Sequence, residues 1–307
     1  MKLSKDRLKI YIAFSAIYFI WGSTYLANKF ALATVPPFIM TGIRFTIAGS
    51  LLMLFLRLRG ELFPDRTMWK HSLVIGGFML FIGNGFIAIA QQKVPSGLTA
   101  LFISITPLYM TIVNWFFNKT EKPSALEIIG ILTGFGGMAL LVYSNSGTGN
   151  GDISFFHLLL VLLSPLAWTF GSIYSKKVHH NNSSFMPIAA QMFCGGILLL
   201  FFSFFKKEWA DFQPELVSFK SLISISFLIV GGSLIAYSAY IWLLKKCPPT
   251  LVSTNTFVNP VIALILGAAL AGETLSFKMV MAAVVIIASV VIITFSHLSK
   301  SKLLSEN

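Results

Sequence analysis

The side chains in this chain that could do chemistry are neutral polar and aromatic residues placed inside long apolar segments. Indole, phenol and carboxamide groups at such depth can stack on a small molecule and hydrogen-bond to it. Aromatic residues at segment ends are usually interface anchors, so those nearer the centres are better candidates for a cavity wall. The sequence therefore predicts a binding cavity lined by Trp21, Ser23, Tyr25, Asn84, Tyr109, Trp168, Ser172, Tyr237, Asn255 and Asn259.

Groups for acid–base, nucleophilic or metal chemistry do not gather at one depth. The carboxylates and the five histidines fall in predicted loops or near segment ends. Catalysis of either kind needs such groups side by side, and no metal-ligand spacing is present. We expect no catalytic residue, no metal site and no cofactor, and we expect Cys194 and Cys247 to stay unpaired.

Composition places the chain in a membrane. Hydrophobic residues make up 56% and charged residues 11% of the 307 residues, and the mean hydropathy is +0.80, whereas soluble domains carry about 25% charged residues. The net charge of +12 could suggest nucleic acid, but no polar segment is long enough to form a clustered basic surface. The expected partners are a small-molecule solute and the lipid bilayer, without nucleic acid, and a monomer and a homodimer both stay open.

Ten apolar runs are long enough to cross about 30 Å of hydrocarbon as helices. The runs are continuous rather than alternating, which favours helices over barrel strands. The first run is too long for a signal peptide and carries polar residues in its middle, so we expect it to be retained. The predicted fold is an all-α multi-pass membrane protein with spans at 10–31, 37–57, 69–91, 96–117, 125–144, 155–176, 184–205, 221–244, 249–271 and 277–297.

The distribution of lysine and arginine predicts the orientation of these spans. With the N-terminus inside, sixteen of these residues fall in inside segments and six outside, the six being Lys29, Lys93, Lys206, Lys207, Lys220 and Lys278. Such an excess marks the cytoplasmic side. We therefore expect both termini in the cytoplasm, and the basic net charge is explained by topology.

The two halves of the chain share one layout. The segment 91–107 matches 244–260 in its basic turn, its first proline and its mid-span proline, and WGSTY at 21–25 is echoed by FGSIY at 170–174. Five spans in each half force the halves into opposite orientations, an arrangement typical of alternating access around a midplane site. We expect a cytoplasmic tail at 1–9, a first repeat at 10–146, a second repeat at 153–297 and a cytoplasmic tail at 298–307.

Two prolines and two polar residues occupy matching positions in these halves. Pro107 and Pro260 each follow a polar residue in mid-span, where a proline frees a backbone carbonyl. We expect helix kinks that line the cavity, with kinks that only improve packing as the alternative. Arg44 corresponds to Gln191, and because Arg44 lies near the outer end of its span we expect both to be structural polar anchors rather than solute ligands.

Several ordered elements together resemble a known family. They are IWGSTY (20–25), PPFIMTGIRF (36–45), GNGFIAIAQQKVPSG (83–97), AWTFGSIY (167–174), FVNPVIALILG (257–267) and GETLS (272–276). In their order and spacing they resemble the drug/metabolite transporter superfamily, with two EamA domains, and within it the YedA-type inner-membrane permeases. The resemblance implies a carrier of the bacterial cytoplasmic membrane, often an exporter, and it implies a helix-end capping role for Glu273.

The leading hypothesis is an inner-membrane transporter that exports amino acids or other small amphipathic metabolites or drugs through a central cavity. A membrane-embedded enzyme and a non-transporting membrane sensor or scaffold are the alternatives. The enzyme would need clustered ionisable residues, and the sensor would not require matched prolines in inverted halves.

Overall fold

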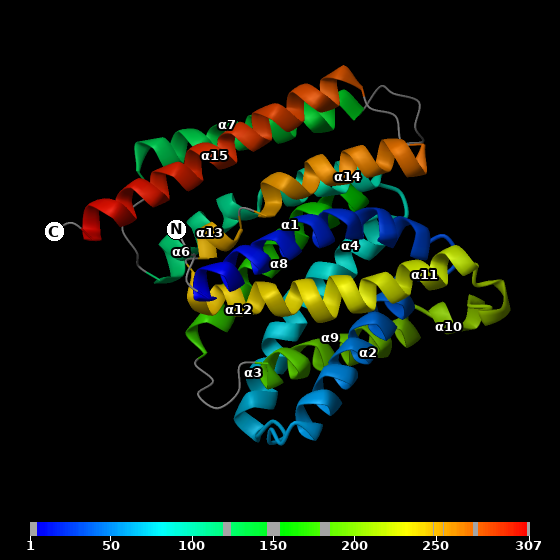
Figure 1. Ribbon diagram of the computed structural model, residues 1–307. Coiled ribbons are helices and arrows are strands. Elements are labelled where there is room, and N and C mark those ends of the chain that lie inside the picture. Colours follow the sequence, from blue (N-terminus) through cyan, green and yellow to red (C-terminus); the bar gives the residue numbers. More distant parts are fainter. Residues whose placement is uncertain are drawn as a thin grey trace.

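The computed structural model describes residues 5–118, 124–145, 154–178, 185–247, 249–253, 255–272 and 276–305, and the regular secondary structure in these ranges is helical (Figure 1). No strand occurs among the described residues. Predicted anchor Glu273 lies outside them.

The helices of the first half correspond to the predicted spans, with the third and fourth spans built from more than one element. They are α1 (Lys5–Ala31), α2 (Pro37–Leu58), α3 (Arg66–Gly76), the π-helix η1 (Gly77–Asn84), α4 (Gly85–Ala90), α5 (Ser96–Ile103), α6 (Thr106–Asn118) and α7 (Ala125–Asn145).

The second half repeats this order with one insertion of two short helices after its second long helix. Its elements are α8 (Phe155–Lys177), α9 (Met186–Phe205), α10 (Glu208–Asp211), the 3₁₀-helix η2 (Pro214–Leu216), α11 (Phe219–Phe227), the π-helix η3 (Leu228–Tyr237), α12 (Ser238–Lys246), α13 (Pro249–Val252), α14 (Asn255–Ala271) and α15 (Phe277–Ser305).

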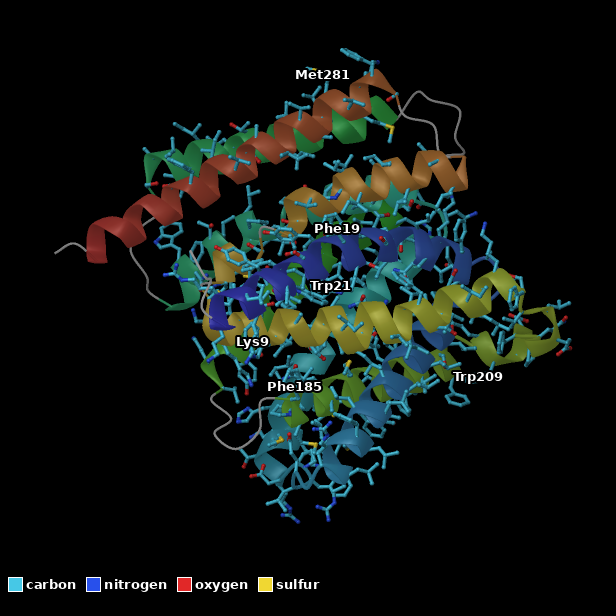
Figure 2. All side chains as sticks on the ribbon, in the orientation of Figure 1. Lys9, Phe19, Trp21, Phe185, Trp209 and Met281 are labelled. Atoms are coloured by element: carbon cyan, nitrogen blue, oxygen red, sulfur yellow. The ribbon has the colours of Figure 1, made fainter. Side chains whose placement is uncertain are left out.

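Seven helical segments of the described chain are long and apolar enough to cross a membrane, namely Arg7–Ala31, Pro37–Leu58, Arg66–Ala90, Ser96–Phe116, Phe155–Lys177, Met186–Phe205 and Phe219–Lys246. Three shorter apolar helices, Ala125–Gly134, Val258–Ala271 and Phe277–Ser289, fall within the other three predicted spans. Large apolar side chains cover the outside of the bundle (Figure 2), and Phe19 and Met281 are 63% and 48% exposed. Such a surface suits lipid rather than water.

Local sequence signals set several helix ends. Pro37 stands at the first turn of α2, where its missing N–H costs nothing. Asp65 accepts a hydrogen bond from Met68 N at 2.7 Å and caps α3. Two N–H groups in the first turn of α2, on Phe38 and Ile39, donate to the carboxylate of Glu208, which is distant in sequence, at 3.1 and 2.9 Å. This contact fastens the short helix α10 to the start of α2.

Helices from the two halves pair with their own counterparts. The helix α2 packs along α9, and α7 packs along α15, the latter pair forming a separate layer at one edge of the bundle (Figure 1). A Cβ on Gly49 of α2 would lie 2.5 Å from Phe193 N, and a Cβ on Gly196 of α9 would lie 2.4 Å from Thr46 N. Because only glycine allows so close an approach, these residues bring the two backbones into contact.

The two chain ends lie on the same side of the bundle. In Figure 1, α1 begins and α15 ends at the left-hand end, and α10 lies at the opposite end. The packed centre between them is built by α1, α2, α9, η1, η3 and α12, whose buried residues form the largest apolar cluster.

Candidate functional site

A cavity lies among the helices that both halves contribute. It holds about 750 Å³ of space not occupied by protein atoms, including the space at its opening. Its wall is formed by Trp21, Thr24, Tyr25, Asn28, Arg44, Phe45, Asn84, Ile87, Ile103, Thr106, Ser164, Pro165, Trp168, Gly232, Tyr237, Tyr240, Ser253, Asn255, Thr256 and Asn259. Most of these residues lie inside apolar helices, so the cavity combines polar groups with an apolar setting.

One face of α1 supplies part of the wall. Trp21, Thr24, Tyr25 and Asn28 follow the spacing i, i+3, i+4, i+7, which places them on a single helical stripe. Gly22 lies off this stripe and packs against α14, where an added Cβ would come within 2.8 Å of Ile262. The close packing of α1 on α14 therefore fixes which face of α1 meets the cavity.

Aromatic rings from three spans form a continuous surface in the wall. The ring centroids of Trp21 and Trp168 are 5.6 Å apart, those of Trp21 and Tyr240 are 5.1 Å apart, and those of Trp168 and Tyr240 are 5.6 Å apart. Trp21 Nε1 also donates to the Gly232 carbonyl at 3.1 Å. These edge-to-face and tilted contacts stabilise the rings in fixed positions, so the wall is a preformed apolar surface.

Behind this surface the hydroxyl groups of Ser172 and Tyr240 form a hydrogen bond whose donor can be assigned. Ser172 Oγ donates to the Trp168 carbonyl at 2.8 Å. Its single proton is then used, so the Tyr240 hydroxyl donates to Ser172 Oγ across 2.9 Å. Ser172 thereby orients Tyr240 without reaching the cavity.

The third and eighth spans each contain a π-helix that ends at a cavity residue. The segment η1 ends at Asn84, and η3 ends at Tyr237. Asn84 Nδ2 donates to the Met79 carbonyl at 3.2 Å, and Ser164 Oγ donates to the Gly83 carbonyl at 2.9 Å. Because π-turns loosen the regular bonding ladder, these side chains satisfy carbonyls that a plain α-helix would pair internally.

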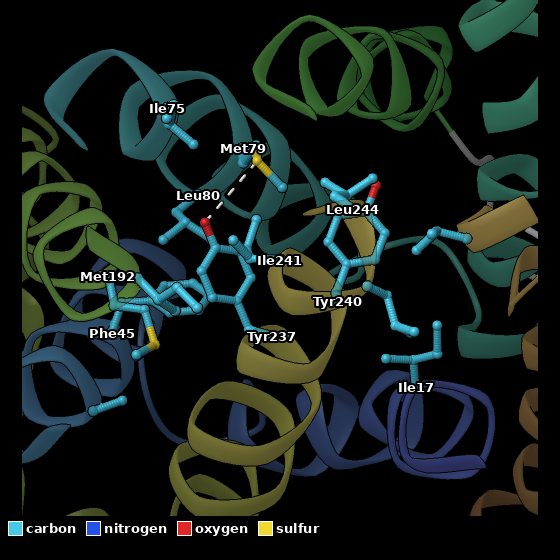
Figure 3. Packing of buried hydrophobic residues seen from close by; sticks show 14 of the residues in the cluster. Ile17, Phe45, Ile75, Met79, Leu80, Met192, Tyr237, Tyr240, Ile241 and Leu244 are labelled. Carbon is cyan, nitrogen blue, oxygen red and sulfur yellow. Dashed lines mark hydrogen bonds between the residues drawn. The ribbon is translucent and has the colours of Figure 1, made fainter. Parts of the chain in front are cut away.

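Tyr237 connects η3 to the neighbouring helices. Figure 3 shows its hydroxyl directed toward Met79, whose sulfur is 4.0 Å away, with Phe45 and Met192 beside the ring. The hydroxyl donates to Gln191 Oε1 at 3.0 Å. Gln191 therefore stands behind the wall as a polar support for a cavity residue.

Arg44 reaches the same π-helix one turn earlier. Its Nε donates to Ser233 Oγ at 2.8 Å, and its Cζ lies 4.6 Å from the centre of the Phe45 ring. Arg44 is only 3% exposed, yet it forms part of the cavity wall. The sequence predicted Arg44 as a structural anchor; the structure gives it an anchoring hydrogen bond and also a place at the cavity.

The fourth and ninth spans are both interrupted, but at different distances from their prolines. The first interruption, at Ser104 and Ile105, directly precedes the helix that contains Pro107. In the ninth span α13 ends at Val252 and α14 begins at Asn255, so α14 runs through Pro260. The two helix breaks therefore stand at different positions relative to Pro107 and Pro260, and matching kinks at these prolines stay a prediction.

Two asparagines on α14 bond to each other and to α1. In the amide orientation that satisfies its neighbours, Asn259 Nδ2 donates to the Tyr18 and Asn255 carbonyls at 2.9 and 3.0 Å, and Asn259 Oδ1 accepts from Asn255 Nδ2 at 3.1 Å. Both side chains lie in the cavity wall. They present fixed amide groups at a place where two spans meet.

The structure brings most of the predicted cavity residues together and leaves three aside. Ser23 donates to the Phe19 carbonyl on another face of α1, Tyr109 packs against a separate apolar cluster, and Ser172 stands behind Tyr240. Sequence reasoning missed Asn28, which the helical spacing from Trp21 could have indicated. It also missed further lining residues, several of which are apolar. These are Phe45, Ile87, Ile103, Thr106, Ser164, Pro165, Gly232, Ser253 and Thr256.

The chemistry of the wall is that of binding. Among the lining residues of the described chain Arg44 alone carries a formal charge, and the others offer hydroxyl, amide, indole and apolar groups. Within the described ranges no three His, Cys, Asp or Glu side chains gather closely enough to hold a metal ion. A small molecule with one apolar part and one polar end matches this set of groups.

Comparison with known proteins gives consistent matches along nearly the whole chain. The model of the EamA-like transporter family matches residues 8–143 and 155–295. The uncharacterized inner membrane transporter YedA of Escherichia coli (strain K12) is 36% identical over 292 residues, 94% of this chain and 92% of YedA. The uncharacterized transporter YvbV of Bacillus subtilis (strain 168) is 26% identical, over 95% of this chain and 93% of YvbV.

Two further matches are more distant. Protein PecM of Dickeya dadantii (strain 3937) is 24% identical, over 94% of each chain. One protein crystal structure superposes with a TM-score of 0.67 at 20% sequence identity, covering 94% of this chain and 97% of that chain. The structural likeness shows a shared fold.

Proposed function

Because the chain belongs to the EamA-like transporter family, we propose that its central cavity binds amino acids or other small amphipathic metabolites and exports them by alternating access. The chain is a multi-pass inner-membrane transporter of the drug/metabolite transporter superfamily. The observation that carries the proposal is the cavity itself, since helices of both halves wall a space with aromatic and polar groups at the depth of apolar spans.

Alternating access requires two structurally equivalent halves that can adopt each other's arrangement. Equivalent helix contacts in the two halves support this equivalence. The contact of α1 with η3 is matched by that of α8 with η1, and the contact of α2 with η3 is matched by that of α9 with η1. The reciprocal approach of Gly49 and Gly196 to the opposite helix follows the same exchange. We propose ten spans in two inverted five-helix repeats, at 10–146 and 153–297, on either side of the cavity.

In the proposed cycle the cavity opens to one side of the membrane at a time. The aromatic surface of Trp21, Trp168 and Tyr240 holds the apolar part of the solute, and the amides of Asn84, Asn255 and Asn259 hydrogen-bond its polar part. The π-helices η1 and η3 lie in equivalent spans next to the cavity. Their looser bonding makes them suitable places for the spans to bend as the halves rock.

Flux into and out of reconstituted vesicles tests the proposal. Purified protein is placed in liposomes preloaded with labelled amino acids, and efflux is followed with and without an imposed pH gradient. Solute-specific flux that unlabelled solute competes away is the expected result, and its dependence on the gradient reports coupling to protons. Absence of flux across a broad panel of amphipathic solutes would contradict a carrier and favour a membrane sensor, while chemical conversion of a solute would favour an enzyme.

A further inference from the structure

Arg44 differs from the other cavity-wall residues of the described chain because its side chain carries a full charge. The side chain is 3% exposed and projects from α2, inside an apolar span. The remaining lining residues identified in the described chain are neutral. A buried arginine in a span is costly unless a counter-charge or a set of hydrogen-bond acceptors compensates it.

Within the described residues that compensation is incomplete. A guanidinium has five N–H donors, and Nε uses one of them on Ser233 Oγ at 2.8 Å. The face of the group rests 4.6 Å from the centre of the Phe45 ring. No carboxylate of the described chain lies within ion-pair distance of Arg44, so the terminal N–H groups stay available at the cavity.

A second observation on the same wall also indicates a ligand. The Oδ1 atom of Asn28 is buried and has no hydrogen-bond partner in the described chain, and Asn28 lines the cavity. Thr24, one turn earlier on α1, lies beside Arg44 at Gly232, since a Cβ there would be 2.7 Å from Arg44 Nη2 and 3.1 Å from Thr24 Cγ2. An amide oxygen without a partner and a guanidinium without a carboxylate nearby, both within the described chain, thus line the same cavity.

We propose that Arg44 binds the carboxylate of the transported solute, so that the substrate class is amphipathic monocarboxylates, zwitterionic amino acids included. This inference rests on the proposed transport function and adds the orientation in which the solute binds. The corresponding residue of the other half, Gln191, is neutral and already accepts from Tyr237. The carboxylate therefore has one recognition point, on α2, which orients the solute.

Three ligands that share one apolar part test this recognition. Binding of 3-phenylpropionate, 3-phenylpropionamide and 3-phenylpropylamine to the full-length protein in lipid nanodiscs is measured by calorimetry near neutral pH. Wild-type protein should bind the carboxylate about ten- to a hundredfold more tightly than the amide, because charge-assisted hydrogen bonds to a buried cation are lost with the amide. The amine should bind most weakly.

Variants assign the preference to Arg44. Arg44→Gln should remove the preference for carboxylate over amide, and Arg44→Lys should keep only part of it because the planar fork is lost. Gly232→Ala, whose added Cβ would lie 2.7 Å from Arg44 Nη2, should weaken carboxylate binding more than amide binding. The exposed Arg57 on the same helix gives the control, and Arg57→Gln should keep the full preference.

The wild-type comparison stands even where a variant does not fold. Equal affinity of wild-type protein for carboxylate and amide, failure of the carboxylate to bind, or a preference that survives in folded Arg44→Gln protein would overturn the inference. Flux measured in vesicles with neutral solutes would still support transport in that event, so failure of the anion site and failure of the transport function are distinguished.

Discussion

Trp21 and Phe19 lie two positions apart on α1 and face different surroundings. Trp21 lies in the cavity wall and contacts Trp168 and Tyr240, whereas Phe19 is 63% exposed on the outside of the bundle. A helical turn of about 100° per residue explains how two aromatic residues so close in sequence serve separate roles. Residue type alone therefore does not identify a cavity residue, and its position on the helix does.

Replacing each of these residues by alanine separates the two roles. Trp21→Ala should reduce solute flux about tenfold or more, since it removes two ring contacts and the hydrogen bond to the Gly232 carbonyl. Phe19→Ala should leave flux within about twofold of wild type because it changes only an outward surface. Flux per folded protein in vesicles is the measurement, and equal losses in both variants would make Trp21 a packing residue.

Glu208, in α10 outside the membrane spans, should make the stability of the protein depend on pH. Burial raises the pKa of its carboxyl above the ordinary 4.5, and the hydrogen bonds from Ile39 and Phe38 N–H and the nearby Lys206 offset only part of that effect. A raised pKa in the folded state means that the protonated form is favoured there. Its stabilising contribution is therefore present below the ordinary pKa and is lost as pH rises through the raised one.

Glu208→Gln removes this titration. The melting temperature of wild type relative to the variant should rise as pH is lowered from neutral toward 4.5, the reverse of the usual behaviour of a salt-bridged carboxylate. Glu215→Gln, at an exposed residue of the neighbouring element η2, gives the control for removing a carboxylate that is not buried. A wild-type advantage that grows with rising pH would contradict the pKa direction.

At the scale of elements, glycine positions decide how closely helices approach. Gly49 lies where a Cβ would meet the backbone of α9 at 2.5 Å, whereas nothing lies within 4 Å of a Cβ on Gly136 of α7. The first contact cannot be relieved by moving a side chain, because the atom met is backbone. Substitution by alanine is therefore expected to have opposite effects on stability at the two positions.

Gly49→Ala should lower the free energy of unfolding by about 1–3 kcal/mol, the cost of forcing packed helices apart. Gly136→Ala should be neutral or stabilise by about 0.5–1 kcal/mol, because alanine favours a helix interior. Unfolding by denaturant in mixed micelles measures both. If Gly49→Ala is tolerated as well as Gly136→Ala, α2 and α9 are not in backbone contact.

Hydropathy predicted the elements more reliably than it predicted their internal form. Long apolar runs define the helices of the described chain because a helix in lipid must satisfy its own backbone bonds. The π-helices ending at Asn84 and Tyr237 were not predicted. A π-turn closes its hydrogen bond one residue later than an α-turn, and this change leaves no mark in the composition or the hydrophobic periodicity of the sequence. Ser23, which was grouped with its neighbours without regard to helical face, lies outside the wall. The place of Arg44 in the wall was not predicted, because it depends on the packing of α2 against η3.

At the scale of the whole molecule, the proposed inversion places three chain positions on particular sides of the membrane. The structure puts the start of α1 and the end of α15 at one end of the bundle, and the excess of lysine and arginine favours that end as cytoplasmic. Five spans per half would then place the segment between the halves, near residue 150, on the outer side. An even number of spans per half would place it inside with the termini.

Reporter fusions distinguish these arrangements. Pairs of reporters, one active only in the cytoplasm and one active only outside it, are fused after residue 307, before residue 1 and within 147–152. Both ends should report the cytoplasm and the internal site should report the outside, because lysine and arginine in short loops hold each half in its own orientation. An internal site that reports the cytoplasm would remove the inverted repeat, and with it the reason for the two halves to alternate around a shared cavity.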